Sequence, residues 1–293
     1  MKRESFGSRL GFILVSAGCA IGIGNVWKFP YICGAYGGAA FILIYLCFLV
    51  ILGIPVLVAE FAVGRGSHTS VAKCFDKLAP AGSGWKPLKF IGIIGCYMLM
   101  MFYTTVGGWM IYYCVKSLRG DFVGATPEAV TQSFSDMLGN APTMMLWMVI
   151  ICLIGFAVCF MGLQNGIEKI SKVMMSALLI IMVILAVHSV MMEGAGEGIR
   201  FYLIPDFQKI KEAGVGNVVF AALSQSFFTL SIGIGAMLIF GSYLDKSRSL
   251  TGEAVSITVL DTFVALTAGF IIIPACFSYG IQPDAGPSLI FIT

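Results

Sequence analysis

Charged residues are scarce in this sequence. Of its 293 residues, 11% are charged and 58% are hydrophobic, whereas an ordinary soluble domain carries roughly 25% charged residues. This balance excludes a soluble globular domain and places the chain in a lipid bilayer. The net charge of +3 is not gathered in a basic stripe with interleaved aromatic residues, so we expect no nucleic-acid partner.

Histidine is almost absent, and the cysteines lack the spacing of metal sites. The 2 histidines are isolated, and the 9 cysteines are scattered mostly through apolar runs. They show neither the short paired spacings of zinc sites nor those of a secreted disulfide framework. The sequence has no His-Glu cluster, serine elbow or phosphate-binding loop. We therefore expect neither an enzyme nor an organic cofactor.

Long apolar runs are what the sequence does contain. A helix needs roughly 20 mostly apolar residues to cross a hydrocarbon core about 30 Å thick, and seven runs approach or exceed that length. Membrane-spanning β-strands would be about ten residues long and would alternate strictly. The prediction is an all-α membrane protein with a single transmembrane domain over residues 1–293. Its spans are Leu10–Tyr31, Ala39–Ala62, Phe90–Val115, Thr143–Met161, Ile170–Met192, Val218–Tyr243 and Ala254–Tyr279.

Lys and Arg are divided unevenly between the connections. If the N-terminus is cytoplasmic, inside segments hold twelve of the 18 positive residues, and the acidic residues lean toward the outer loops. Cytoplasmic loops of membrane proteins carry such an excess of Lys and Arg. We expect a multi-pass protein of the cell inner (plasma) membrane with a cytoplasmic N-terminus. The polar connections are residues 64–89 inside and 116–142 and 193–217 outside, with a short basic turn at 162–172.

Two of the predicted spans contain paired glycines. The tetrapeptide IGIG occurs at residues 21–24, within GCAIGIGN, and again at residues 232–235, within TLSIGIGA. Glycine weakens a helix by about 1 kcal/mol relative to alanine, and a helix broken inside a membrane exposes backbone groups that need a cavity or a ligand. Interrupted helices in corresponding positions of two halves are typical of a transporter's binding site. The alternative is that these glycines only allow close helix packing.

Several stretches of the chain resemble the neurotransmitter:sodium symporter family, in family order and across essentially the whole sequence. They are RLGFILVSAGCAIGIGNVWKFPY, GIPVLVAEFAVGR, GIEKISKVMM, IPDF and LSQSFFTLSIGIGAMLIFGSYL. The resemblance implies an inverted-repeat symporter fold with discontinuous helices one and six. The first repeat would cover about residues 8–192 and the start of the second about 217–293, ending after helix seven. It also implies sodium-coupled symport of an amino acid by alternating access.

The resemblance supplies candidate residues for two sodium ions. Oxygen atoms of helices one, six and seven would hold the first ion, together with the carboxylate of the substrate. The matching positions are Ala20, Asn25, Thr229 and Asp261. The second ion would take the carbonyls of Gly18 and Ile21, and its remaining ligands would lie on helix eight, which this sequence does not include. An all-oxygen shell suits a hard cation.

Asp261 departs from the family pattern, which has an amide at this position. It is the only acidic residue of its span, and a carboxylate near mid-bilayer costs roughly 2.5 to 3.5 kcal/mol on insertion scales, so it should have a partner. Animal relatives balance sodium with a nearby chloride. We expect Asp261 to act both as ligand and as built-in counter-charge, so that chloride is not required. The alternative is a protonated aspartic acid hydrogen-bonded in the core.

The substrate pocket is also assigned by the resemblance. It maps to Cys19, Ala20, Gly22, Leu99, Tyr103, Phe228, Thr229, Ser231 and Ile234. Monoamine transporters have an aspartate where Gly22 stands, so the substrate here should bring its own carboxylate. Tyr103 would donate its phenol to that carboxylate, and Phe228 would lie across the pocket. Leu99 and Ile234 would receive an apolar or aromatic side chain, although residues of these types more often simply pack a core.

Gate and support positions can be matched as well. Lys28 stands at the family's outer-gate arginine, and Arg3 at the inner-gate one. Lysine cannot form the planar two-pronged pair of arginine with a carboxylate, so we expect a weaker or differently paired outer gate. Glu60 matches a glutamate that supports the unwound part of helix six. The alternative for Glu60 is a charge at the inner end of its span near Arg65.

A second hypothesis concerns the length of the chain. The family's fold has two inverted five-helix repeats and further helices, whereas this chain stops two spans into the second repeat. The alternative to a transporter is therefore a truncated, non-transporting membrane protein, either a remnant or an interaction partner of a full-length relative. An open reading frame past Thr293 with several more apolar spans would favour the transporter.

Overall fold

The computed structural model describes residues 6–283 and 291, and every regular element in these ranges is helical. Labels with α denote α-helices and labels with η denote π-helical segments. The elements are α1 (Arg9–Ala20), η1 (Gly24–Lys28), α2 (Phe29–Ala35), α3 (Ala39–Phe48), η2 (Leu49–Gly53), α4 (Ile54–Ser67), α5 (Val71–Leu78), α6 (Leu88–Arg119), α7 (Pro127–Gly139), α8 (Ala141–Phe160), η3 (Leu163–Glu168), α9 (Lys169–Val190), α10 (Ala195–Leu203), α11 (Phe207–Ala213), α12 (Val215–Thr229), α13 (Ala236–Gly241) and α14 (Leu250–Ser278).

The predicted spans coincide with helices, but two of the spans are broken. In the described ranges, five continuous stretches are long and apolar enough to cross a membrane, or six if α1 is joined to η1 and α2, to which α1 is inclined by 53°. The run at 218–243 is divided between α12 and α13, and neither half alone is long enough to span a bilayer. The structure therefore confirms an all-α membrane fold in which the first and sixth spans are interrupted.

Short helices occupy the connections that the sequence pattern left as polar segments. These are α5, α7, α10 and α11. Local caps explain two of them: the Thr126 hydroxyl accepts a hydrogen bond from the Ala129 N–H at the start of α7, and the Asp206 carboxylate accepts from two N–H groups at the start of α11. The turn expected at 162–172 is also shorter, because Gly162 turns the chain with φ 82° and helix resumes at Leu163.

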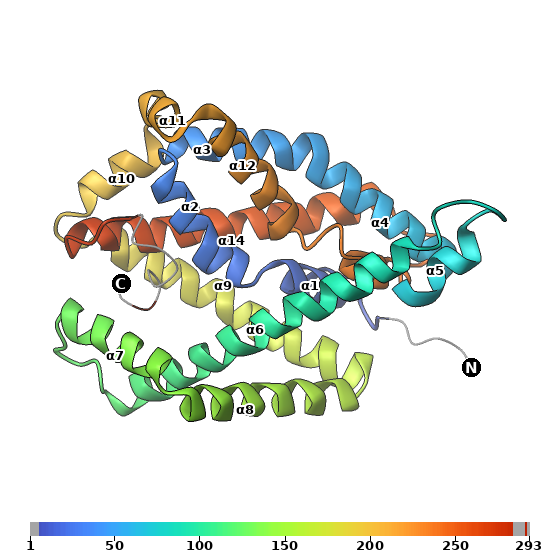
Figure 1. Ribbon diagram of the computed structural model, residues 1–293, viewed down its shortest axis with the longest axis horizontal. Helices are drawn as coiled ribbons and strands as arrows, with labels where there is room; N and C mark the ends of the chain where they lie inside the picture. The colour runs from blue at the N-terminus through green and yellow to red at the C-terminus, as the bar shows by residue number, and fades with distance from the viewer. Residues whose placement is uncertain (1–5, 284–290, 292–293) are drawn as a thin grey trace.

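Helix α14 forms the centre of the molecule (Figure 1), where it contacts α1, η1, α2, α4, α9 and α10. Small residues allow these close approaches. A Cβ atom at Gly269 would lie 2.3 Å from the Tyr202 ring, whose hydroxyl donates to the Leu266 carbonyl at 2.9 Å. Pro274 interrupts the hydrogen-bond ladder of α14, and the nearby Ile271 carbonyl accepts from Ser189 Oγ at 2.6 Å. The central helix is thus held from several sides.

Helices α6 and α8 pack against each other on one flank of the molecule (Figure 1). Gly108 allows the contact, since a Cβ atom there would lie 2.8 Å from the Met148 backbone nitrogen. The outward side of α8 is apolar and exposed, and Phe160 at its end is 93% exposed. Such a surface is costly in water and suits contact with lipid.

Candidate binding site at the two helix breaks

The first break separates α1 from η1 at residues 21–23. Ile21 leaves the helical conformation with ψ 106°, and the Gly22 N–H donates to Asn25 Oδ1 at 3.3 Å. In a continuous helix the Gly22 N–H would donate to the backbone carbonyl four residues earlier, but here it donates to a side chain. The α-helical hydrogen-bond pattern is therefore interrupted at this break.

The second break separates α12 from α13 at residues 230–235. Ser231, Gly233 and Gly235 all have positive φ, at 52°, 90° and 78°, which is a conformation that glycine adopts at little cost. Glu60 on α4 supports this segment: its Oε1 accepts from the Gly233 N–H at 2.6 Å and its Oε2 from the Leu238 N–H at 3.2 Å. The Glu60 carboxylate thus satisfies N–H groups around the start of α13.

A buried polar cluster connects both breaks to α14. Asn25, Thr229 and Asp261 are each 0% exposed. Asn25 Nδ2 donates to Asp261 Oδ1 at 2.8 Å and to Thr229 Oγ1 at 3.1 Å, and Thr229 Oγ1 donates to Asp261 Oδ2 at 2.8 Å. Among the described residues, the ion pairs involve other carboxylates and none reaches Asp261. A buried carboxylate with only neutral donors is unstable without a compensating cation or proton.

The remaining predicted ion ligands surround the first break. Ala20 ends α1 and is 4% exposed, and Ile21 follows it and is 6% exposed. Gly18 lies one turn earlier, where a Cβ atom would come within 3.2 Å of Met175 Sδ on α9. Three predicted ligands, Asn25, Thr229 and Asp261, are thus in mutual contact, whereas Gly18 lies within α1 and Ile21 directly follows it.

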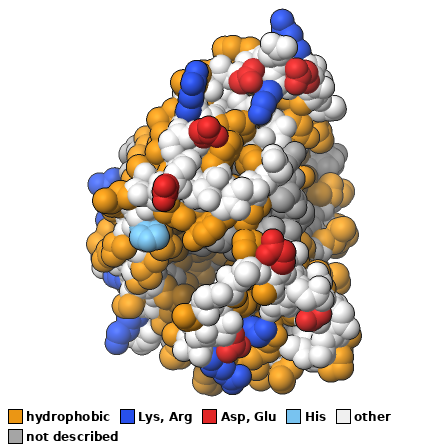
Figure 2. All heavy atoms as spheres, turned by 90° about the vertical axis from the view of Figure 1, so that its left-hand side faces the viewer, with side chains coloured by type: hydrophobic (Ala, Val, Ile, Leu, Met, Phe, Trp, Pro, Cys, Tyr) orange, Lys and Arg blue, Asp and Glu red, His pale blue; other side chains and the backbone are white. Residues whose placement is uncertain are grey.

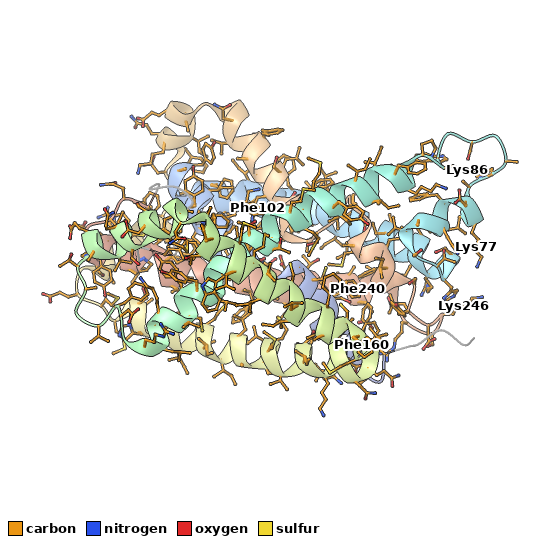
Figure 3. All side chains as sticks on the ribbon, turned by 60° about the horizontal axis from the view of Figure 1, so that its bottom comes forward. Lys77, Lys86, Phe102, Phe160, Phe240 and Lys246 are labelled. Atoms are coloured by element: carbon orange, nitrogen blue, oxygen red, sulfur yellow. The ribbon has the colours of Figure 1, made fainter. Side chains whose placement is uncertain are left out.

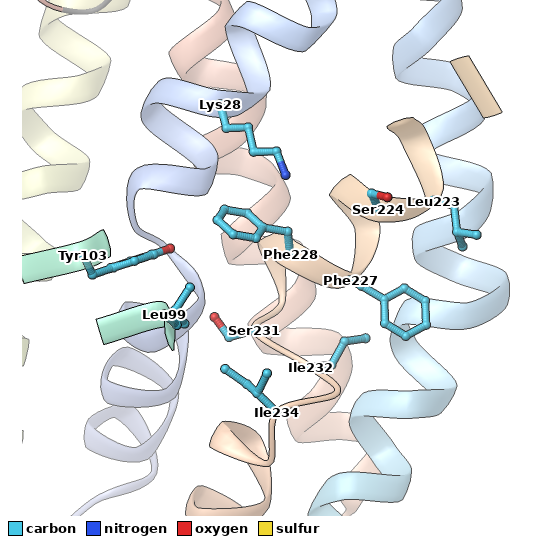
Figure 4. A pocket seen from close by; sticks show the side chains of 10 residues that line it. All are labelled: Lys28, Leu99, Tyr103, Leu223, Ser224, Phe227, Phe228, Ser231, Ile232 and Ile234. Atoms are coloured by element: carbon cyan, nitrogen blue, oxygen red, sulfur yellow. The ribbon is translucent and has the colours of Figure 1, made fainter. Parts of the chain in front are cut away.

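A cavity of about 490 Å³ opens beside the second break (Figure 4). Five predicted pocket residues line it: Leu99, Tyr103, Phe228, Ser231 and Ile234. The other four predicted residues, Cys19, Ala20, Gly22 and Thr229, are not part of this lining. Two of them lie directly behind it, since the Cys19 carbonyl accepts from Ser231 Oγ at 3.0 Å and a Cβ atom on Gly22 would lie 3.9 Å from the Tyr103 hydroxyl.

Lys28 and Phe228 form one side of the cavity (Figure 4). The Lys28 ammonium lies 4.1 Å from the centre of the Phe228 ring, which is within the range of a cation–π contact. The same two residues also border a second cavity of about 350 Å³, with Ile23, Trp27, Tyr31 and Phe102. The Phe228 ring therefore borders both cavities, and the Lys28 ammonium contacts one face of the ring. Arg3, the predicted inner-gate residue, lies outside the described residues.

Sequence reasoning missed part of the site. Leu223, Ser224, Phe227 and Ile232 also line the cavity. Gln225 was missed as well: this side chain is 0% exposed, and its Nε2 donates to the Gly24 carbonyl at 3.1 Å. A glutamine in the middle of the apolar run LSQSFF was a detectable signal, because a polar side chain in a membrane span usually has a partner.

Comparison with known proteins agrees with this architecture. The sequence profile of the sodium:neurotransmitter symporter family matches residues 3–143 and 128–280. The chain therefore belongs to the sodium:neurotransmitter symporter family, a family of transporters. It is 37% identical over 290 residues to YhdH of Bacillus subtilis (strain 168), described as an uncharacterized sodium-dependent transporter. It is 34% identical over 299 residues to a sodium-dependent transporter of Haemophilus influenzae.

A solved structure shows the same fold. The chain is similar to MhsT, crystallised in complex with L-phenylalanine, with 38% identity and a TM-score of 0.92. The match covers 99% of this chain and 65% of MhsT, and the chain spans 63% and 65% of the two sequence relatives. This similarity confirms the expected inverted-repeat symporter fold over the helices that the chain contains.

Proposed function

We propose that this chain forms the ion- and substrate-binding part of a symporter that couples sodium entry to uptake of an amino acid with an apolar or aromatic side chain. The observation that supports this proposal most directly is the buried Asp261 carboxylate, which has no cationic partner in the described part of the chain and lies where two broken helices meet. A hard cation such as sodium would supply the missing positive charge, and side-chain and carbonyl oxygen atoms would ligate it.

For the first sodium ion, the proposal uses the side chains of Asn25, Thr229 and Asp261 and the carbonyl of Ala20. The three side chains are within hydrogen-bond distance of one another, and Asn25 would turn its Oδ1, which now accepts from the Gly22 N–H, toward the ion in place of its Nδ2. Gly18 and Ile21 are proposed to contribute carbonyls to a second ion. Because the substrate carboxylate would complete the first ion's shell, binding of the two solutes is coupled electrostatically. Each charge that crosses is driven by about 2.3 kcal/mol per 100 mV.

The cavity supports an amino acid as the substrate. Tyr103 and Ser231 supply polar groups beside the two breaks, whereas Leu99, Ile232 and Ile234 supply apolar surface (Figure 4). No acidic residue occurs at position 22, so a substrate amine has no carboxylate there and the substrate would bring its own. The similarity to MhsT, whose complex contains L-phenylalanine, supports an apolar or aromatic side chain.

Chloride is proposed not to be required, because Asp261 already places a negative charge beside the first ion. In this proposal the N-terminus lies in the cytoplasm and the protein resides in the cell inner membrane. Lys77, Lys86 and Lys246 lie at one end of the molecule (Figure 3), as a cytoplasmic end requires. Acidic side chains are spread among basic ones at the end that carries α7 and α10 (Figure 2).

Binding of labelled amino acids to the purified chain in lipid nanodiscs tests the proposal. We expect phenylalanine, tryptophan or leucine to bind in sodium and not in potassium or choline, with the same affinity in chloride and gluconate. Uptake by the longer open reading frame, if one exists, then tests transport. Binding that is indifferent to sodium contradicts the symport proposal.

A further inference from the structure

Glu168 is a buried carboxylate that the proposed binding site does not use. It ends η3 and is 3% exposed. Its Oε2 accepts from the Gly7 N–H at 2.9 Å, and its Oε1 accepts from Ser8 Oγ at 3.3 Å and from Lys172 Nζ at 2.7 Å. Gly7 and Ser8 directly precede α1, so the carboxylate lies at the N-terminus of that helix, where backbone N–H groups lack partners and negative charge is favourable.

The first turn of α1 is shaped to admit this carboxylate. Ser8 caps α1 by accepting from the Gly11 N–H at 2.9 Å. A Cβ atom at Gly11 would overlap the Glu168 side chain, 2.0 Å from its Oε1 atom. Only glycine at position 11 therefore lets the Glu168 side chain lie across the start of α1.

The other end of this contact is fixed to the α8–α9 hairpin. Gly166 packs so closely on α8 that a Cβ atom there would lie 2.3 Å from the Val158 carbonyl oxygen. Glu168 is continuous with α9 and is paired with Lys172 one turn further along it. The carboxylate is thus part of the hairpin and reaches across to a helix that is distant in sequence.

Helix α1 carries the candidate site at its opposite end, where the Cys19 carbonyl accepts from Ser231. A second carboxylate also holds the beginning of α1: Glu253 of α14 accepts from Arg9 Nε at 3.0 Å. Glu253 joins α1 to the central helix α14, whereas Glu168 joins it to the α8–α9 hairpin. In the proposed orientation both contacts lie at the cytoplasmic end, so a solute leaving the site along α1 toward the cytoplasm requires one of them to open.

We propose that Glu168 is a latch that closes the cytoplasmic side of the site by holding the first turn of α1 against the α8–α9 hairpin. The latch rests on the proposed symport function, in which the site opens to each side in turn. When the contact opens, α1 separates from η3 and stays paired with α14 through Arg9 and Glu253. Glu168 is a positioning residue, since it acts on the site through α1 and does not line the cavity.

Thiol labelling from one side of the membrane tests the latch. Cys19 is partly exposed and lies at the site end of α1, and the other eight of the 9 cysteines are replaced with alanine. A membrane-impermeant maleimide is applied to inside-out and to right-side-out vesicles. Loss of charge-assisted hydrogen bonds in Glu168→Ala should raise the cytoplasmic labelling rate about tenfold and leave the outer rate unchanged. Gly11→Ala should act in the same direction, because its methyl group displaces the carboxylate.

Two controls distinguish a latch from a merely structural contact. Lys169→Gln removes an exposed charge from the same helix turn and leaves the contacts of Glu168 with Gly7, Ser8 and Lys172 in place, so its labelling rate should stay near that of the parent. Gly11→Ala should add nothing in a Glu168→Ala background. Faster labelling from both sides indicates general loosening and overturns the proposal, as does an unchanged cytoplasmic rate in Glu168→Ala. Failure of sodium and amino acid to slow labelling of the parent would instead count against the symport function.

Discussion

Replacing Asp261 with asparagine removes one negative charge from the polar cluster with almost no change in shape. In the parent, both carboxylate oxygens accept hydrogen bonds at 2.8 Å, one from Asn25 and one from Thr229. Asparagine offers one acceptor oxygen and one N–H₂ group. With the oxygen toward Asn25, the N–H₂ group donates to the Thr229 hydroxyl, whose own proton then loses its acceptor. The substitution therefore weakens the cluster in two ways, by loss of charge and by loss of one hydrogen bond.

The size of the effect follows from Coulomb's law. Two unit charges 4 Å apart attract by about 4 kcal/mol at an effective dielectric constant near 20. The amide oxygen of asparagine can still ligate an ion and recovers part of this energy. We expect a net loss of about 2.7 kcal/mol, which corresponds to about 100-fold weaker sodium binding. Added chloride should restore part of the loss, because it returns a negative charge to the vicinity of the ion.

The assay measures amino-acid binding in nanodiscs as sodium is titrated, once in chloride and once in gluconate. The matched control is Asp136→Asn, the same substitution at an exposed position of α7. We expect Asp136→Asn to leave the sodium midpoint unchanged. If Asp261→Asn binds sodium as tightly as the parent in gluconate, the assignment of Asp261 as ligand and counter-charge is wrong.

Three further substitutions have defined outcomes. Tyr103→Phe should weaken amino-acid binding about tenfold in an equilibrium binding assay, because the hydroxyl near the first break is lost. The unfolding temperature should change little, because the rest of the side chain is retained. Glu60→Gln should lower stability by about 1.5 to 3 kcal/mol in denaturant unfolding, since the charged acceptor of the Gly233 N–H becomes neutral. Lys28→Gln should speed amino-acid dissociation several-fold, because the cation–π contact with Phe228 contributes about 0.5 to 2 kcal/mol; an unchanged dissociation rate would remove Lys28 from the gate.

Local sequence signals predicted the two breaks well. Gly22 lies in the first break and Gly233 and Gly235 lie in the second, and the structure ends α1 and α12 at Ala20 and Thr229, immediately before the segments that contain the IGIG repeats. Local signals predicted the short helices poorly. Segments such as α7 and α11 depend on single capping residues, Thr126 and Asp206, rather than on a long apolar period, so their composition resembles that of a loop.

Apolar length and charge distribution were enough to establish a helical membrane protein, because each span must satisfy its own backbone hydrogen bonds in lipid whatever its neighbours are. Glycine spacing was enough to locate the interruptions, since the weakness of a helix there is a local property. Local sequence does not determine which groups contact one another at those interruptions. The contact of Asn25 with Asp261, and that of Glu168 with the start of α1, join residues far apart in the chain. Only the packing of α14 against η1, and of the α8–α9 hairpin against α1, brings those residues together.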